Sequence, residues 1–292
     1  MKEYQPLDNC KGFNLSDNIT FLKETCKNIR KDVFQMINNV QCGHLGGSLS
    51  CVEILVCLYF QVMNIDPLKP QWEERDRFIN SKGHATAAYY ATLAHRGYFE
   101  REELIGSFIN VRSHFEEHGS VSVPGVDIST GSLGQGVSVG AGMALAAKLH
   151  KRSYKTYVLV GDGECQEGQI WEAAMFGAQY ELGNLIVIID KNDLQVSGKT
   201  KDVISVDPLA QKWSSFKWDV HSADGHDPEQ LLDCLGSLSE GNSPKVLITQ
   251  TVKGKGISFM ENNPDWHSFK KLTGEELKIA EQELGIKCLK KF

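Results

Sequence analysis

Apolar residues recur at steps of three and four near the start of the chain, which is the spacing of one face of a helix. They are Ile19, Leu22, Cys26, Ile29, Val33, Met36, Ile37 and Val40, and they predict an amphipathic helix. After the turn GHLGGS, Ser48 is expected to cap a second helix that runs to about Val62. The segment RFINS, which follows a polar connection, is predicted to be a short strand.

From Thr156 onward, uniformly apolar segments alternate with helical patterns. The strands are YVLV, LIVIID, KWDVH and KVLITQTV, and the helices include QIWEAAMFGAQYEL and PEQLLDCLGSL. Apolar strands that alternate with helices are typical of an α/β fold, in which a parallel sheet is covered by helices on both faces. A preceding helix, VSVGAGMALAAKL, opens after STGSLGQG and is expected to end at about His150. Its small residues indicate that another element packs very close to it.

These elements predict one main domain with short additions. Residues 1–17 have no apolar pattern and are expected to form a loose arm. Residues 18–270 form the α/β domain. Residues 271–292 are predicted to add a C-terminal helix of the same domain, in the segment TGEELKIAEQELG, with its threonine as the N-cap.

Composition and charge narrow the class of protein. The chain has 292 residues and is 41% hydrophobic, which suits one large α/β domain. Its net charge of −6 argues against a nucleic-acid surface, which needs a basic face. A small basic cluster is expected to lie in a solvated loop; it comprises Lys253, Lys255, Lys270 and Lys271. Because no leader pattern and no long apolar run are seen, we expect a cytoplasmic protein without membrane contact.

Polar residues stand at the tips of two successive buried strands. Asp162 lies in GDG just after the first, and Asn192 just after the second. Ligands of parallel sheets bind at the carboxyl ends of the strands, so the two side chains are expected to meet there. Carboxylate and amide oxygens suit Mg²⁺ or Ca²⁺, and the bare glycines beside Asp162 suit a diphosphate. The alternative is that GDG and KND are simple turns, but their equivalent positions favour a metal–diphosphate site.

The sequence lacks the usual nucleotide-binding patterns, which limits the ligands that could carry the predicted diphosphate. SKGHAT lacks the first glycine of a phosphate-binding loop, and GSLGQG has the wrong spacing for a dinucleotide fingerprint. ATP and NAD are therefore not expected.

Four histidines lie in tight loops that could converge on one pocket. They are His44 in CGHLGGS, His84 in SKGHAT, His118 in EEHGS and His267 in PDWHSF. Imidazoles donate and accept hydrogen bonds near neutral pH, so the group is typical of a pocket for a polyhydroxylated or phosphorylated molecule. The remaining histidines are expected to lie on the surface; they are His95, His114, His150, His221 and His226.

GDG followed about thirty residues later by Asn is the signature of proteins that bind thiamine diphosphate. Together with GHLGGS, DRFINSKGHA, PGVDISTGSLGQG and TVKGKGISFMENNPDWH, it resembles the amino-terminal half of the transketolase family. The resemblance covers roughly residues 18–270.

The resemblance implies a role for each matching cofactor residue. Asp162, Asn192 and the backbone carbonyl of Leu194 match ligands of Mg²⁺, for which Ca²⁺ or Mn²⁺ can substitute. Gly163 and Glu164 match positions at the diphosphate, and Gly131, Ser132 and Leu133 match the loop that contacts the aminopyrimidine.

It also implies roles around the substrate. His84 and His267 match histidines near the diphosphate and reaction centre, and His44 and His118 match those that face the donor sugar. Glu167 and Glu172 match acids that link paired cofactor sites across the subunit interface. Two features depart from the pattern or modify it. Glu117 stands where the family usually has glycine, and Cys165, inside the cofactor turn, would be oxidant-sensitive if exposed.

The family's carboxy-terminal half supplies the glutamate that activates the cofactor and the arginines that clamp sugar phosphate, and this sequence ends before it. We therefore expect the N-terminal subunit of a two-component transketolase, which forms a heterotetramer with a C-terminal subunit. It would transfer a two-carbon ketol unit from a ketose phosphate to an aldose phosphate. One alternative is a specialised donor, such as apulose phosphate or a sulfo-sugar. Others are a subunit of another thiamine-diphosphate enzyme, such as a 2-oxo acid dehydrogenase alpha-type chain or a synthase, and a binding module without catalysis.

Overall fold

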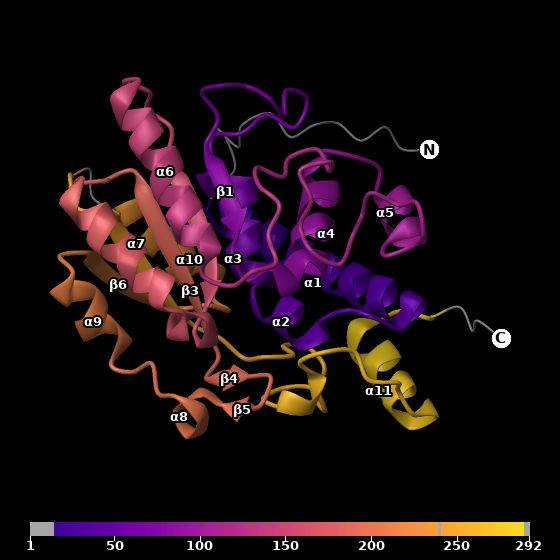
Figure 1. Cartoon of the computed structure of the whole chain (residues 1–292). Coiled ribbons are helices and arrows are strands. Elements are labelled where there is room, and N and C mark those ends of the chain that lie inside the picture. The colour runs from indigo at the N-terminus through magenta and orange to yellow at the C-terminus, as the bar shows by residue number, and fades with distance from the viewer. Residues whose placement is uncertain (1–14, 239–240, 289–292) are drawn as a thin grey trace.

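The computed structural model describes residues 15–238 and 241–288, which form an α/β domain around a five-stranded parallel sheet (Figure 1). The strands, in spatial order, are β1 (Arg77–Asn80), β2 (Thr156–Gly161), β3 (Leu185–Lys191), β7 (Lys245–Gln250) and β6 (Asp219–Asp224). The apolar residues of β2 and β3 are buried, as expected for central strands covered on both faces. The predicted fold class is confirmed.

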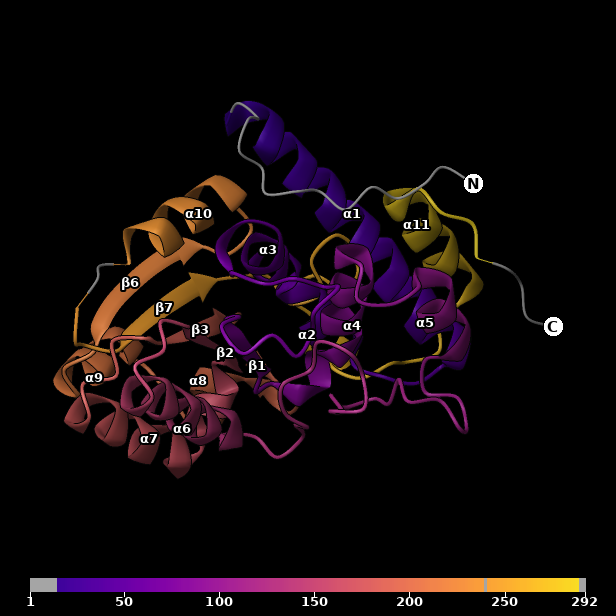
Figure 2. The ribbon, with the colours of Figure 1, turned by 90° about the horizontal axis from the view of Figure 1, so that it is seen from above.

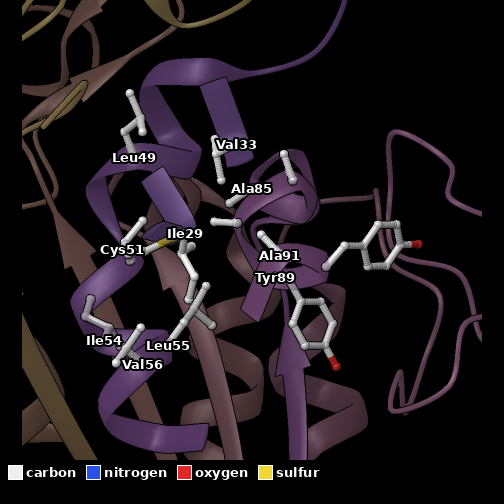
Figure 3. Close-up of a cluster of buried hydrophobic side chains, with 14 of the residues drawn as sticks. Ile29, Val33, Leu49, Cys51, Ile54, Leu55, Val56, Ala85, Tyr89 and Ala91 are labelled. Carbon is white, nitrogen blue, oxygen red and sulfur yellow. The ribbon is translucent and has the colours of Figure 1, made fainter. Parts of the chain in front are cut away.

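Helices on one face of the sheet enclose the larger core (Figure 2). They are α1 (Leu15–Val40), α2 (Leu45–Ser50), α3 (Val52–Cys57), α4 (Thr86–Arg96) and α10 (Pro228–Ser237). The predicted apolar stripe of α1 packs here: Ile29 lies beside Leu55 of α3, and Val33 lies close to Ala85, just before α4 (Figure 3). This packing holds the loops on either side of α2 and α4 above the tips of the strands.

The opposite face carries α6 (Gln135–Leu149), α7 (Gly168–Gln179) and α9 (Leu209–Ser215). The small residues of α6 permit the close contact predicted from its sequence. A Cβ built on Gly140 would lie 2.5 Å from Cγ2 of Val158 in β2, so a larger residue would force the helix away from the sheet. This helix therefore covers the sheet.

Short elements complete the described chain. They are the π-helical turn η1 (Leu58–Val62), η2 (Gly83–Ala85), α5 (Arg101–Ser107), η3 (Gly163–Gln166), β4 (Leu194–Gln195), β5 (Gly198–Lys199), α8 (Thr200–Val203), η4 (Pro264–Trp266) and α11 (Gly274–Leu284). The threonine cap predicted for α11 is present, because Thr273 and Glu276 form a reciprocal capping box.

Two predicted boundaries are wrong. Ser48 caps no helix: it lies inside α2, and its hydroxyl donates to the carbonyl of His44, the residue at the N-cap. The chain also breaks at Cys51, so the expected single helix is three short segments. At the amino end, α1 begins at Leu15, inside the expected arm. Residues 1–14 of that arm and residues 289–292 lie outside the described residues.

Candidate cofactor and active site

The tips of β2 and β3 lie side by side, as the sequence predicts. Asp162 follows β2, and its carboxylate accepts hydrogen bonds from the backbone of Gly163 at 2.8 Å and of Asp193 at 2.6 Å. The second bond ties it to the tip of β3, where the side chain of Asn192 accepts from the backbone of Leu194 at 3.2 Å. The three predicted metal ligands therefore lie in two turns, one after β2 and one after β3, that are hydrogen-bonded to each other.

The donor set fits a hard divalent cation. Burial, with the nearby charge of Asp190, raises the pKa of Asp162 to about 6. A buried carboxylate that is poorly compensated in this way is stabilised by a bound cation. Among the described residues, no group of three or more His, Cys, Asp or Glu side chains is placed to hold a metal. The candidate site would instead combine one carboxylate with an amide and the carbonyl of Leu194.

Beneath these tips lies a buried ion pair that the sequence pattern did not reveal. Lys82 and Asp190 are in contact, with side chains 1% and 0% exposed. The carboxylate also accepts from the hydroxyls of Ser50, at 2.6 Å, and Thr251. Burial alone would raise the pKa of Asp190, but Lys82, together with the hydrogen bonds from Ser50 and Thr251, outweighs burial, and the pKa is lowered. We call these four residues the floor of the site.

The prediction that Lys253 lies in a solvated loop is wrong, because its side chain is buried. Its ammonium lies 3.2 Å from the carbonyl of Leu194 and 2.9 Å from Nδ1 of His267. Burial, together with the charge of Lys82, lowers the pKa of Lys253 to about 8. A buried amine next to a predicted metal ligand is suited to hold an anion such as a phosphate.

The four loop histidines converge, as predicted. His44 is central: its ring centroid is 5.6 Å from that of His84, 6.2 Å from His118 and 5.4 Å from His267. A glycine of α2 allows this closeness. A Cβ built on Gly47 would lie 2.9 Å from Cδ2 of His84. With Asp162 and Lys253, the four histidines form what we call the rim of the site.

Burial favours the neutral imidazole at three residues of the rim, His44, His84 and His267. It lowers the pKa of His84 well below the ordinary value, with a further contribution from Lys82. It lowers the pKa of His267 to about 3, helped by the charge of Lys253. The pKa of His44 is also lowered by burial, although Glu117 opposes the shift. Neutral imidazoles both donate and accept hydrogen bonds, which suits sugar hydroxyls.

The turn after β2 is tied down by Glu164. Its buried carboxylate accepts from the hydroxyl of Ser81 and from the backbone N–H groups of Gly134, at 2.9 Å, and Gly161, at 3.0 Å. Because these contacts occupy the side chain, its predicted cofactor contact would come from the backbone. Cys165 in the same turn is 1% exposed, and burial raises the pKa of its thiol well above the ordinary value. The protonated, enclosed thiol is not an exposed oxidation site.

The other predicted residues lie at the exposed edge of the site. Gly131, Ser132 and Leu133 are exposed just before α6. A Cβ built on Gly83 would lie 2.9 Å from the backbone nitrogen of Gly131, so this loop reaches the residue beside His84. Glu167, at the N-cap of α7, and Glu172 are exposed. The roles assigned to these residues stay predictions.

His226 is not the plain surface residue that the sequence suggested. Its Nδ1 lies 2.9 Å from Glu53, and its Nε2 accepts from the backbone of Val252 at 2.8 Å. Glu53 also forms a buried ion pair with Arg30. This network holds the segment that leads into Lys253 from behind the site.

A parallel α/β domain with an acid and an amide at adjacent strand tips, under neutral imidazoles and buried amines, defines a class of phosphate-cofactor-binding proteins. A family model described as transketolase, thiamine diphosphate binding domain, matches residues 22–292. The chain therefore belongs to the transketolase family.

Individual relatives agree. The chain is 46% identical to an apulose-4-phosphate transketolase subunit of Phocaeicola vulgatus, over 82% of this chain and 85% of that protein. It is 41% identical to a 6-deoxy-6-sulfo-D-fructose transketolase subunit of Clostridium, over 92% of this chain and 98% of the relative. The solved transketolase of Campylobacter jejuni superposes with a TM-score of 0.86 at 31% identity, over 92% of this chain and 43% of that one. No helix among the described residues is long and apolar enough to cross a membrane.

Proposed function

We propose that this chain is the amino-terminal, cofactor-binding subunit of a two-component transketolase. The assembled enzyme would transfer a two-carbon ketol unit from a ketose phosphate to an aldose phosphate. The observation that carries the proposal is the match to separate transketolase subunits over 85% and 98% of their length. The rim supports it, because neutral histidines suited to hydroxyls stand beside a charged anchor for a diphosphate.

Thiamine diphosphate with Mg²⁺, for which Ca²⁺ or Mn²⁺ can substitute, is the proposed cofactor. Asp162, Asn192 and the carbonyl of Leu194 would hold the metal, and the backbone of Gly163 and Glu164 the diphosphate. The buried ammonium of Lys253 would add a positive charge there. When bound, the cofactor supplies the carbon nucleophile that accepts the two-carbon unit.

The chain's own side chains would bind and orient the sugar. His267 lies against Lys253, and His84 lies beside His267; both would contact groups near the diphosphate and reaction centre. His44 and His118 would face the hydroxyls of the donor. Because burial lowers the pKa values of His44, His84 and His267, these rings would stay neutral, and each would donate one hydrogen bond and accept another.

A carboxy-terminal subunit is the proposed partner, in a heterotetramer with two sites. The loop 131–133 would meet the aminopyrimidine in company with that subunit, and Glu167 and Glu172 would link paired sites. Obligate interfaces of this kind bury roughly 2,000 Å² or more. Nucleic acid and membrane binding are not part of the proposal, and a cytoplasmic location stays a prediction.

The proposed donor is a ketose, of either the ordinary or a specialised kind. Relatives named for apulose 4-phosphate and for a sulfo-fructose favour the specialised kind. A role in a 2-oxo acid dehydrogenase or synthase fits less well, because the substrates of those enzymes do not need a four-histidine rim.

The test is a coupled assay of the chain with Mg²⁺ and thiamine diphosphate, run with and without the purified carboxy-terminal subunit. Donors are xylulose 5-phosphate, apulose 4-phosphate and 6-deoxy-6-sulfofructose, with ribose 5-phosphate or glyceraldehyde 3-phosphate as acceptor. We expect turnover of at least one donor only when both subunits are present. Turnover by the isolated chain, or none by the assembly with any donor, would contradict the proposal.

A further inference from the structure

Glu117 is the acid that touches the rim. Its Oε1 lies 2.9 Å from Nδ1 of His44, with the two side chains 31% and 20% exposed. Among residues 15–238 and 241–288, no other carboxylate comes within ion-pair distance of the four rim histidines. The contact is close enough for an ion pair, but it is not aligned as a hydrogen bond, and Nδ1 of His44 is buried without another hydrogen-bond partner.

Both partners of this contact are anchored by their surroundings. Phe115, two residues before Glu117, is buried against Tyr90 and Phe99. After Glu117, the hydroxyl of Tyr90 donates to the carbonyl of His118 at 3.4 Å and accepts from the backbone N–H of Ser120 at 3.0 Å. The loop is therefore pinned on both sides of Glu117.

His44 is held just as firmly. It is the N-cap of the fully buried helix α2, and its carbonyl accepts from the hydroxyl of Ser48 at 2.8 Å. The backbone N–H of Phe269 donates to the carbonyl of Gly43, the residue before His44, at 2.6 Å. The packed structure thus fixes the backbone on both sides of the contact between Glu117 and His44.

The contact favours one tautomer of His44. An ionised carboxylate only accepts, so a hydrogen on Nδ1 is favoured 2.9 Å from Glu117, and in that neutral imidazole Nε2 is an acceptor. A second proton is opposed by burial, by His118 and by Lys253. The rings of His84 and His267, which also face His44, add no negative charge.

His267 has the opposite arrangement. Its Nδ1 lies 2.9 Å from the ammonium of Lys253, which only donates when charged. Nδ1 of His267 is therefore the acceptor, and Nε2 carries the hydrogen. Two facing rings with centroids 5.4 Å apart thus offer one acceptor and one donor.

Such a pair matches a hydroxyl group, which donates one hydrogen bond and accepts another. We propose that Glu117 is a positioning residue that holds the proton on Nδ1 of His44, so that Nε2 accepts a hydrogen bond from a hydroxyl of the donor sugar. This inference rests on the proposed function for the identity of the sugar. The protonation pattern itself is a property of the chain alone.

The first experiment measures that pattern without any activity. Nitrogen chemical shifts of ¹⁵N-labelled histidine distinguish the two neutral tautomers in the full chain. We expect His44 to carry its hydrogen on Nδ1 in the wild type and to lose that preference in Glu117→Leu. Glu117→Gln keeps an acceptor and should keep the tautomer, which makes it the rescue variant. Glu116→Leu, at an exposed neighbouring acid, is the matched control and should change nothing.

The second experiment uses the assembled enzyme. Glu117→Leu should raise KM for the donor about tenfold while the melting temperature stays unchanged, with a smaller effect in Glu117→Gln and none in Glu116→Leu. A His44 that carries its hydrogen on Nε2 in the wild type, or the same tautomer in wild type and Glu117→Leu, would overturn the inference. An unchanged KM in Glu117→Leu would also overturn it. Failure of the proposed function would appear instead as absent turnover in the wild-type assembly.

Discussion

The floor and the rim of the site lie next to each other and handle buried charge in opposite ways. In the floor, Lys82 and Asp190 neutralise each other, and two hydroxyls complete the contacts of the carboxylate. In the rim, Asp162 has a raised pKa and Lys253 a lowered one, because each is buried with too little opposing charge. The floor is therefore complete in the chain itself, whereas a bound cation and a bound anion would stabilise the rim.

The difference separates stability from function. Groups that are fully paired contribute to a single, well-ordered structure, and groups left with uncompensated charge destabilise the free protein. A divalent cation would relieve Asp162, and a diphosphate would relieve Lys253. Variants of the floor should therefore affect folding, and variants of the rim should affect binding and turnover.

The largest stability effect is expected in the floor. Lys82→Met leaves Asp190 charged and buried without its partner, which should lower the free energy of unfolding by about 3–5 kcal/mol. Urea unfolding of the full chain measures it. The double variant with Asp190→Asn removes both charges and should recover much of the loss. If the single and double variants were equally unstable, the pair would not act as a unit.

Removing rim imidazoles should leave the fold intact but reduce turnover. His44→Ala and His267→Ala should each lower kcat/KM of the assembled enzyme about ten- to a thousandfold, the usual range for positioned acid–base and hydrogen-bonding groups. His150→Ala, at an exposed position at the end of α6, is the control. Values within a factor of about two of wild type for both variants would make the histidine cluster merely structural.

At Lys253, a smaller effect on the free energy of unfolding is expected, opposite in sign to that of Lys82→Met. Because its pKa is about 8 in the folded chain and 10.5 ordinarily, burial of the charged form destabilises the fold below pH 8, and the penalty fades as the pH rises toward 10.5. Lys253→Met should be more stable than wild type near neutral pH by roughly 1–2 kcal/mol, after allowing for two lost hydrogen bonds. It should also bind thiamine diphosphate more weakly. Unfolding curves across this pH range check the sign, and a gap that widened with pH would contradict it.

Much of the fold was predictable because its signals are local. The stripe of α1 and the apolar strands follow directly from sequence periodicity. The meeting of Asp162 and Asn192 followed from a general rule about strand ends in parallel sheets. The sequence predicts one continuous helix to about Val62, because nothing local marks the break at Cys51.

The floor and Lys253 could not be predicted, because both depend on tertiary contacts. Lys82 and Asp190 are 108 residues apart, and the acid at the end of LIVIID is the only local hint of the pair. Lys253 lies in a polar, glycine-containing segment that is typical of a solvated loop. Its burial depends on a distant glycine: a Cβ on Gly46 would lie 3.1 Å from its Cγ.

The central claim is that the rim of this chain is a metal and thiamine diphosphate site. Calorimetric titration of thiamine diphosphate into the assembled enzyme, with and without Mg²⁺, tests it most directly. We predict binding that requires Mg²⁺ in the wild type and in Asp193→Asn, a control at an exposed neighbour, and loss of binding in Asp162→Ala and Asn192→Ala. Unchanged affinity in either alanine variant would contradict the account.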